Sequence, residues 1–272
     1  MRTKLFPITL LAGVAAGLIR ACEWRWAWED AERGLMKLNY WLSLLLLGVT
    51  LVFFLSVLLV ARGAPKRHDS DWDVSDLKLP APLLGWAGMA GVLALLVSAA
   101  LDIRKFITVR LPGEPLSELS SLIFAVLSVF AGITVLIVIR AASRRTLKRS
   151  YGIYMLVPVF WACFWLVRDI GRYAIDPIQL RFFYDMMGAI FALLSLYAAA
   201  GFFYSQARTR RTLVYCSMGI FFSLITLLGA GLYCLLWGGL PADSQFHAAD
   251  LCRFGFVLLY LPAIQLTADR SQ

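Results

Sequence analysis

A group of charged residues interrupts an otherwise apolar stretch between Trp161 and Gly188. It includes Arg168, Asp169 and Asp185, and strongly hydrophobic runs flank it on both sides. Ionisable side chains are costly in an apolar solvent and commonly mark binding sites or proton relays there. The segment is therefore the first place to look for chemistry in this chain.

Asp185 is the most informative member of this group. The run Asp176-Pro177-Ile178-Gln179 supplies an N-cap acid, a first-position proline and a third-position glutamine, which predicts a helix beginning at Pro177. Asp185 lies eight residues further on, or about 12 Å along the helix axis. Its carboxylate would then be buried and would need a partner. The candidate partners are Arg168, Arg181 and Arg253, with Asp102 and Asp169 as competing negative charges.

Two interpretations of this charged group stay open. A pair between Asp185 and Arg168 or Arg253 could form a substrate-binding or proton-coupling site. Alternatively, each group lies within a turn or two of a membrane interface, where arginine can extend to water and aspartate can be hydrated. We weigh structural anchoring above a ligand site. The candidate ligand- or ion-binding residues are Asp185, Arg168, Asp169, Arg253 and Tyr184.

Motifs for familiar enzymes are missing from the sequence. It contains no G-x-S-x-G, no H-E-x-x-H and no phosphate-binding lysine loop. Its two histidines, His68 and His247, lie far apart, and its five cysteines show no C-x-x-C spacing. We therefore assign no catalytic residue, no metal and no cofactor from the sequence.

Composition determines which elements must position these residues. Of the 272 residues, 60% are hydrophobic and only 16% are charged, and the mean hydropathy is +0.74. Such a chain has too little polar surface for a water-soluble globule, so its solvent is lipid. We predict an all-α polytopic bundle that forms one integral membrane domain over 1–272. Eight spans are expected near 5–22, 40–61, 83–101, 122–139, 151–167, 182–204, 213–237 and 248–266.

The first span has an alternative interpretation as a signal peptide, which would leave seven spans. Basic residues precede its apolar run, as in a secretory signal. No A-x-A-like cleavage site follows, and Arg20 stands where small residues belong, which favours an uncleaved anchor. Gly13 and Gly17 form a GxxxG face, which suggests that this segment packs closely against another helix.

The distribution of basic residues predicts the orientation. Fifteen of the 26 Lys and Arg residues lie in the N-terminus, the C-terminus and the loops after the second, fourth and sixth spans. Short loops rich in Lys and Arg stay in the cytoplasm, so both termini are predicted to be cytoplasmic. This rim also explains the net charge of +9, and the sequence shows no nucleic-acid motif. We therefore exclude nucleic acid as a partner.

One part of the chain resembles a known group of proteins. The segments WLVRDIGRYAIDP, FYDMMGAIFALLSLYAAAGF and RTRRTLVY, between Trp161 and Leu227, are similar to multi-pass membrane proteins of anaerobic Gram-positive bacteria that have no assigned activity. The resemblance covers about a quarter of the chain. It implies a bacterial cytoplasmic membrane and implies no catalytic roles.

Three classes of function remain. The first is a non-enzymatic regulatory or accessory module that acts through helix contacts with a protein partner or a second copy. The second is a small transporter or ligand-binding bundle that uses Asp185 as a membrane-embedded carboxylate. The third is a membrane enzyme, which would need Asp185 and Asp169 to face one cavity. We place the regulatory module first, and the lipid bilayer is a partner in all three.

Overall fold

A computed structural model describes residues 5–26, 28–30, 35–36, 41–63, 82–108, 115–173, 183–204, 208–238 and 248–270. Within these ranges, eight helices are long and apolar enough to cross a membrane. The prediction of an all-α polytopic bundle with eight spans is therefore confirmed.

Each expected span corresponds to one helix. The helices are α1 (Leu5–Trp26), α2 (Trp41–Gly63), α3 (Pro82–Thr108), α4 (Pro115–Ser143), α5 (Gly152–Tyr173), α6 (Phe183–Phe203), α7 (Thr209–Trp237) and α8 (Ala248–Arg270). Between α1 and α2, the short strands β1 (Trp28–Asp30) and β2 (Leu35–Met36) pair in antiparallel fashion. A 3-10 turn, η3 (Arg149–Tyr151), leads into α5. The expected start of the sixth helix at Pro177 falls outside the described residues.

Several helices extend beyond the spans expected from hydropathy. The first span was predicted to end at Cys22, but α1 continues to Trp26. Its polar residues Arg20 and Glu23 are buried inside the bundle, each with 3% of its surface exposed. Hydropathy reports the solvent that a residue prefers, so it truncates a helix whose polar end is covered by protein.

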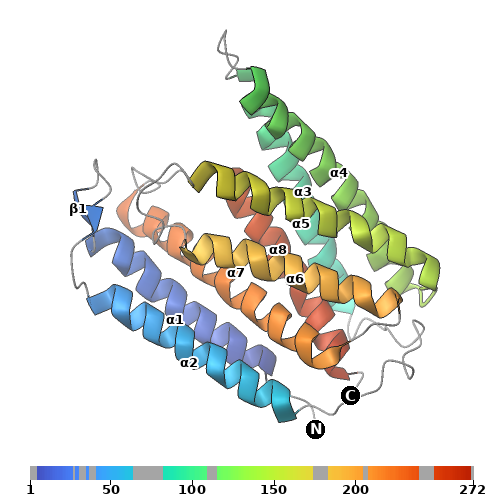
Figure 1. The fold of residues 1–272 in the computed structure, drawn as a ribbon, viewed down its shortest axis with the longest axis horizontal. Helices are drawn as coiled ribbons and strands as arrows, with labels where there is room; N and C mark the ends of the chain where they lie inside the picture. Colours follow the sequence, from blue (N-terminus) through green and yellow to red (C-terminus); the bar gives the residue numbers. More distant parts are fainter. Residues whose placement is uncertain are drawn as a thin grey trace.

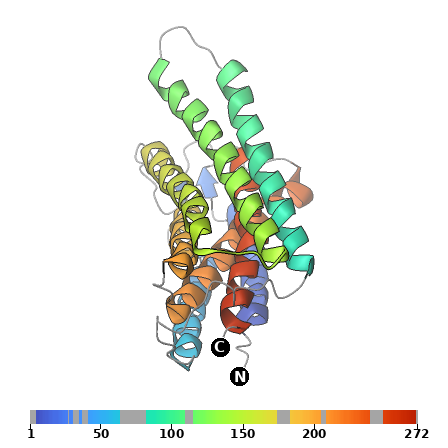
Figure 2. The same cartoon turned by 90° about the vertical axis from the view of Figure 1, so that its right-hand side faces the viewer.

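The α7 helix lies at the centre of the bundle and packs against α1, α2, α6 and α8. Figure 1 shows α1 and α2 on one side of α7, with α6 and α5 on the other. Figure 2 shows α3 and α4 as a tilted pair whose upper ends project beyond their neighbours. The α3 helix packs along α8, and this contact joins the α3–α4 pair to the rest of the bundle.

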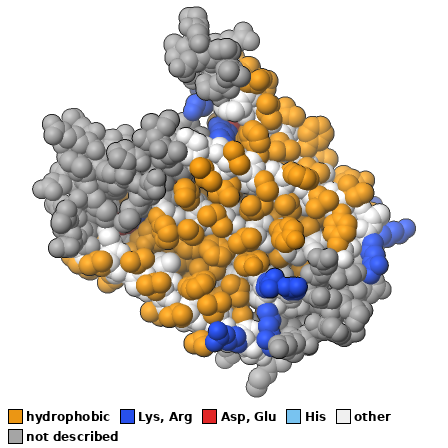
Figure 3. Space-filling model, viewed as in Figure 1, with side chains coloured by type: hydrophobic (Ala, Val, Ile, Leu, Met, Phe, Trp, Pro, Cys, Tyr) orange, Lys and Arg blue, Asp and Glu red, His pale blue; other side chains and the backbone are white. Residues whose placement is uncertain are grey.

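The helices alternate in direction, so α1 begins and α8 ends at the same end of the bundle (Figures 1 and 2). Hydrophobic side chains cover most of the described surface in the view of Figure 3, and Lys and Arg side chains gather mainly near its lower and right-hand edges. Large apolar residues such as Leu11, Leu59 and Phe160 are more than 60% exposed. This outer surface is suited to contact with lipid chains.

The GxxxG face of α1 packs against α7. A Cβ atom added at Gly17 would lie 2.7 Å from the Cβ of Leu228 and 3.2 Å from the carbonyl oxygen of Leu224. At Gly13, the added atom would lie 2.6 Å from a Leu224 methyl group. Small residues therefore let the α1 and α7 backbones approach closely, as the spacing predicts.

We predict that Gly17→Ala lowers thermal stability because its methyl group would overlap Leu228 and the α7 backbone. Overpacking of this kind costs about 1–3 kcal/mol. Gly48→Ala on α2 is the matched control, since a Cβ at that position meets no atom within 4 Å. Melting temperatures in detergent would check this, and equal values for the two variants would contradict close packing of α1 against α7.

Candidate functional site

Buried and half-buried polar residues from all eight helices meet near the end of the bundle where α1 ends and α8 begins. We call this group the charged layer. A residue belongs to this layer if its side chain contacts another member or if it is itself a buried aspartate. The members are Arg20, Glu23, Ser43, Ser98, Asp102, Ser121, Arg168, Asp169, Asp185, Thr226, Asp250 and Arg253. A polar layer that involves every helix places a strong constraint on how the helices can be arranged.

Arg253 on α8 is the most deeply buried charge in this layer, with 0% of its surface exposed. Its Nη2 donates to Asp102 on α3, and its Nη1 donates to Asp250 one turn earlier on α8. Its Nε lies 3.1 Å from the hydroxyl oxygen of Ser98 on α3. All three guanidinium nitrogens thus have an acceptor, and this arginine links α8 to α3.

Arg168 on α5 binds the same aspartate from the other side. Its Nη2 lies 3.2 Å from Asp102 Oδ1 and 3.4 Å from the hydroxyl of Ser121 on α4. The guanidinium carbons of both arginines also lie over the ring of Phe124 on α4. The distance to the ring centroid is 5.0 Å for Arg168 and 4.6 Å for Arg253. Cation–π attraction to this ring adds to the ion pairs. Asp102 therefore connects α3, α5 and α8.

Arg20 on α1 forms the second centre of the layer. Its Nη1 lies 2.5 Å from Glu23 Oε2, and the Ser43 hydroxyl on α2 donates to the other oxygen of Glu23 at 2.7 Å. The guanidinium carbon of Arg20 lies 5.0 Å from the centroid of the Trp24 ring and 4.9 Å from the centroid of the Tyr184 ring. Tyr184 belongs to α6, so this arginine brings α1, α2 and α6 together.

Asp185 on α6 lies between these two centres. Only 3% of its surface is exposed, and it accepts a hydrogen bond of 2.6 Å from the Thr226 hydroxyl on α7. It also interacts electrostatically with Arg20 and with Asp250. Within the described ranges, no Lys or Arg nitrogen lies within 4 Å of its carboxylate. Asp185 thus lies between an arginine and another carboxylate without an ion pair of its own to a described residue.

The expected pairing of Asp185 with Arg168 or Arg253 is wrong. Both arginines bind Asp102 instead, because α3 packs along α8 and carries Asp102 to them. The sequence suggested Asp102 only as a competing charge. The third suggested partner, Arg181, lies outside the described residues.

The other candidate residues are also placed by the structure. Asp169 on α5 is buried, with 3% exposed, and Tyr184 contacts Arg20 through its ring rather than facing Arg168 or Arg253. All five candidates therefore belong to the charged layer or touch it. Whether they bind a ligand stays a prediction.

Sequence reasoning missed four important members, namely Arg20, Glu23, Asp250 and Thr226. A signal for three of them was present. Arg20 and Glu23, and likewise Asp250 and Arg253, are opposite charges three residues apart inside an apolar helix. That spacing places both side chains on one helix face, so each pair could have been recognised as a buried ion pair. Thr226 carried no such signal.

The layer does not have the arrangement of a metal centre. Among the residues that the structure describes, no three His, Cys, Asp or Glu side chains come close enough together to hold a metal ion. Cys22, Cys234 and Cys252 lie towards this end of the bundle, and all five cysteines are unbonded. The chemistry available here is that of carboxylates, guanidiniums and hydroxyls.

Comparison with known proteins finds no family model, no curated protein and no solved structure that matches the chain.

We predict that Arg253→Leu strongly destabilises the protein, because it removes the buried guanidinium that Asp102 and Asp250 share and leaves Asp102 with Arg168 alone. Breaking a buried ion pair by removing one partner costs about 3–5 kcal/mol. Arg104→Leu on α3 is the matched control, since Arg104 is an exposed arginine near the same end of the bundle. Thermal unfolding in detergent would measure both, and a melting temperature unchanged in Arg253→Leu would contradict the central place of Arg253.

Proposed function

We propose that this multi-pass membrane protein is a small transporter or ligand-binding bundle that takes up a positively charged ligand at Asp185. One observation carries the proposal. Among the described residues, this nearly fully buried carboxylate accepts one side-chain hydrogen bond, from Thr226, and its charged neighbours are the attractive Arg20, which lies beyond ion-pair distance, and the repulsive Asp250. An ionised carboxylate offers about four acceptor sites, so Asp185 can accept more. A proton or a small organic ammonium ion would relieve the repulsion between the two carboxylates.

The surroundings of Asp185 support a prepared site rather than an anchor alone. Anchoring is already achieved by ion pairs elsewhere in the layer, where Asp102 binds Arg168 and Arg253. Asp185 takes no part in those pairs, although keeping a carboxylate buried is costly. Residues that bear such a cost inside a membrane usually serve binding or proton transfer.

A second buried polar group lies nearby on α5. The indole N–H of Trp165 has no acceptor among the described residues, and the side chain is fully buried. Its ring packs against Phe254 with centroids 5.0 Å apart. Phe254 in turn packs against Gly188, one turn beyond Asp185 on α6, where an added Cβ would lie 2.6 Å from its ring. A ligand held near Asp185 could thus include an acceptor for the indole.

The other two classes stay as alternatives. A regulatory or accessory module would act through exposed helix faces, but the GxxxG face of α1 is occupied by α7 and does not serve a partner. A membrane enzyme would need Asp185 and Asp169 to face one cavity, and Asp169 is not among the groups that interact electrostatically with Asp185. A bound protein partner without a small ligand would favour the first of these alternatives over our proposal.

We further propose that the protein resides in a bacterial cytoplasmic membrane with both termini in the cytoplasm. The excess of Lys and Arg at the end of the bundle that carries the start of α1 and the end of α8 supports this orientation. The charged layer would then lie near the outer face of the membrane.

The orientation can be tested with reporter fusions at Gln272. We expect a green fluorescent protein fusion to fluoresce and an alkaline phosphatase fusion to be inactive, since the phosphatase folds only outside the cytoplasm. A fusion of each reporter after Gly238, between α7 and α8, is the control and should give the opposite pattern. An active phosphatase at Gln272 would contradict the orientation.

The ligand site can be tested by native mass spectrometry of protein extracted gently from its own membrane. We expect a small cationic molecule to accompany the wild type and to be absent from Asp185→Asn, which keeps the side-chain shape but loses the charge. Thr226→Val should weaken retention because it removes the hydrogen bond to Asp185. Thr134→Val is the matched control, since Thr134 donates only to carbonyls of its own helix.

A proton in place of an organic cation would leave no added mass. It would instead give the wild type a protonated carboxyl band in the infrared spectrum that disappears in Asp185→Asn. If neither a bound cation nor such a band distinguishes wild type from a folded Asp185→Asn variant, Asp185 is a structural anchor and the proposal fails.

A further inference from the structure

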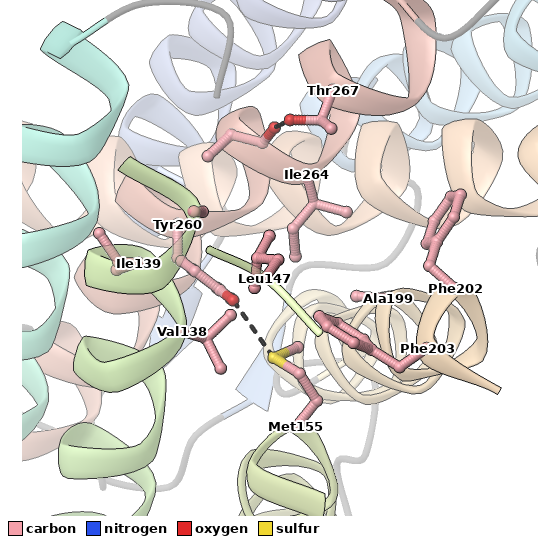
Figure 4. Close-up of a pocket in the computed structure, with 12 residues that line it drawn as sticks. Val138, Ile139, Leu147, Met155, Ala199, Phe202, Phe203, Tyr260, Ile264 and Thr267 are labelled. Atoms are coloured by element: carbon pink, nitrogen blue, oxygen red, sulfur yellow. Dashed lines mark hydrogen bonds between the residues drawn. The ribbon is translucent and has the colours of Figure 1, made fainter. Parts of the chain in front are cut away.

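A cavity lies at the opposite end of the bundle from the charged layer, among α4, α5, α6 and α8 (Figure 4). Its volume is about 80 Å³, and it opens to the outside of the bundle. Met155, Phe203, Tyr260 and Ile264 are among the twelve residues that line it. Compact small-molecule sites typically enclose about 300–1,000 Å³, so this space suits part of a slender apolar group, such as a stretch of an acyl chain, rather than a whole compact ligand.

The wall of this cavity offers a ligand almost no polar contact. The Tyr260 hydroxyl donates to the sulfur of Met155 at 3.6 Å, and the Thr267 hydroxyl donates to the carbonyl of Ala263 at 2.6 Å. The remaining lining side chains are apolar. Whatever occupies the cavity must therefore be apolar where it touches these residues.

The chain segment that borders the cavity is strongly basic. Residues 140–149 contain five Lys and Arg residues and no acidic residue. Ala142 and Leu147 of this segment belong to the cavity wall, and the exposed residues Arg144 and Arg145 lie between them in the chain. Two guanidinium groups are thus carried by the turn that borders the apolar space.

Arg145 has a backbone conformation that usually belongs to glycine. Its φ angle is 57°, in the left-handed region. Its N–H bonds to the carbonyl of Ala142 at 3.2 Å, and the N–H of Thr146 bonds to that of Ala141 at 3.0 Å. This is the Schellman arrangement that ends many helices, in which glycine is preferred at the left-handed position. The chain tolerates a less favourable residue there, and that residue adds a positive charge at the rim.

We propose that this cavity binds an anionic phospholipid, with one acyl chain among Met155, Phe203, Tyr260 and Ile264 and the phosphate on Arg144 and Arg145. An apolar space bordered by cations matches a molecule with an apolar tail and an anionic head. Arginine is well suited to the head because its planar fork binds phosphate oxygens. This lipid site lies at the other end of the bundle from Asp185 and does not depend on the proposed function.

Native mass spectrometry with added lipid tests this site. The probes are palmitoyl-oleoyl phosphatidylglycerol and phosphatidylcholine with the same chains. We expect the wild type to retain the anionic lipid at least threefold more than the neutral one, and Arg145→Gly to lower that preference because only Arg144 remains for the phosphate. Arg145→Gly suits the left-handed position, so its melting temperature should be equal or higher. Arg62→Gln, which removes an exposed charge from the end of α2, is the matched control and should keep the preference.

A second variant tests the acyl chain. Ala199→Phe should fill the cavity and reduce retention of both lipids at least threefold, and Ala142→Leu serves the same purpose if the first variant does not fold. Equal retention of the two lipids by the wild type would overturn the proposal. An equal loss of preference in Arg62→Gln and Arg145→Gly would also overturn it, as would unchanged retention in a folded cavity-filling variant.

Discussion

A charge buried in an apolar bundle must have a partner, and the arrangement of this protein depends on how that requirement is met at Arg253. Its guanidinium cannot reach water, so Asp102 and Asp250 must lie where its nitrogens can bind them. Asp102 is carried by α3, so the requirement determines how α3 lies along α8. Arg168 then binds the same carboxylate and brings in α5, while Ser121 brings in α4. Lipid-facing helices have little hydrophobic reason to prefer one neighbour over another, so polar contacts of this kind give the bundle its specificity.

Satisfying these arginines leaves Asp185 in an unusual position. The ion pairs of the layer form around Arg253 and around Arg20, and Asp185 lies between these centres with a hydrogen bond from Thr226 and Asp250 as a like-charged neighbour. An asparagine would accept the same hydrogen bond without the cost of burying a charge, and it would lose only the attraction to Arg20, which forms no ion pair with Asp185. The position makes sense if a positive ligand or a proton completes it. The fixed pairs around it would hold such a site in place while the ligand enters and leaves.

The sequence was sufficient for the fold class and for the number and approximate position of the spans, because hydropathy reports directly on lipid exposure. It also drew attention to the segment that holds Asp185. It could not predict the partners, since the pairing of Arg253 with Asp102 joins residues 151 positions apart. That contact depends on which helices are neighbours, and hydropathy carries no information about helix order. Only the pairs at i, i+3, such as Arg20 with Glu23, were within reach of sequence reasoning.

Two double-mutant cycles test most directly how the charges are paired. One combines Arg253→Leu with Asp102→Leu, and the other combines Arg253→Leu with Asp185→Leu, with the free energy of unfolding measured for every variant. Contacting residues typically show coupling of about 0.5–3 kcal/mol, whereas separate ones are additive within about 0.5 kcal/mol. We expect strong coupling between Arg253 and Asp102 and clearly weaker coupling between Arg253 and Asp185, which are linked only through Asp250. Strong coupling in the second cycle, with additivity in the first, would show that Asp185 is the partner of Arg253 and would contradict both the architecture of the layer and the ligand site built on it.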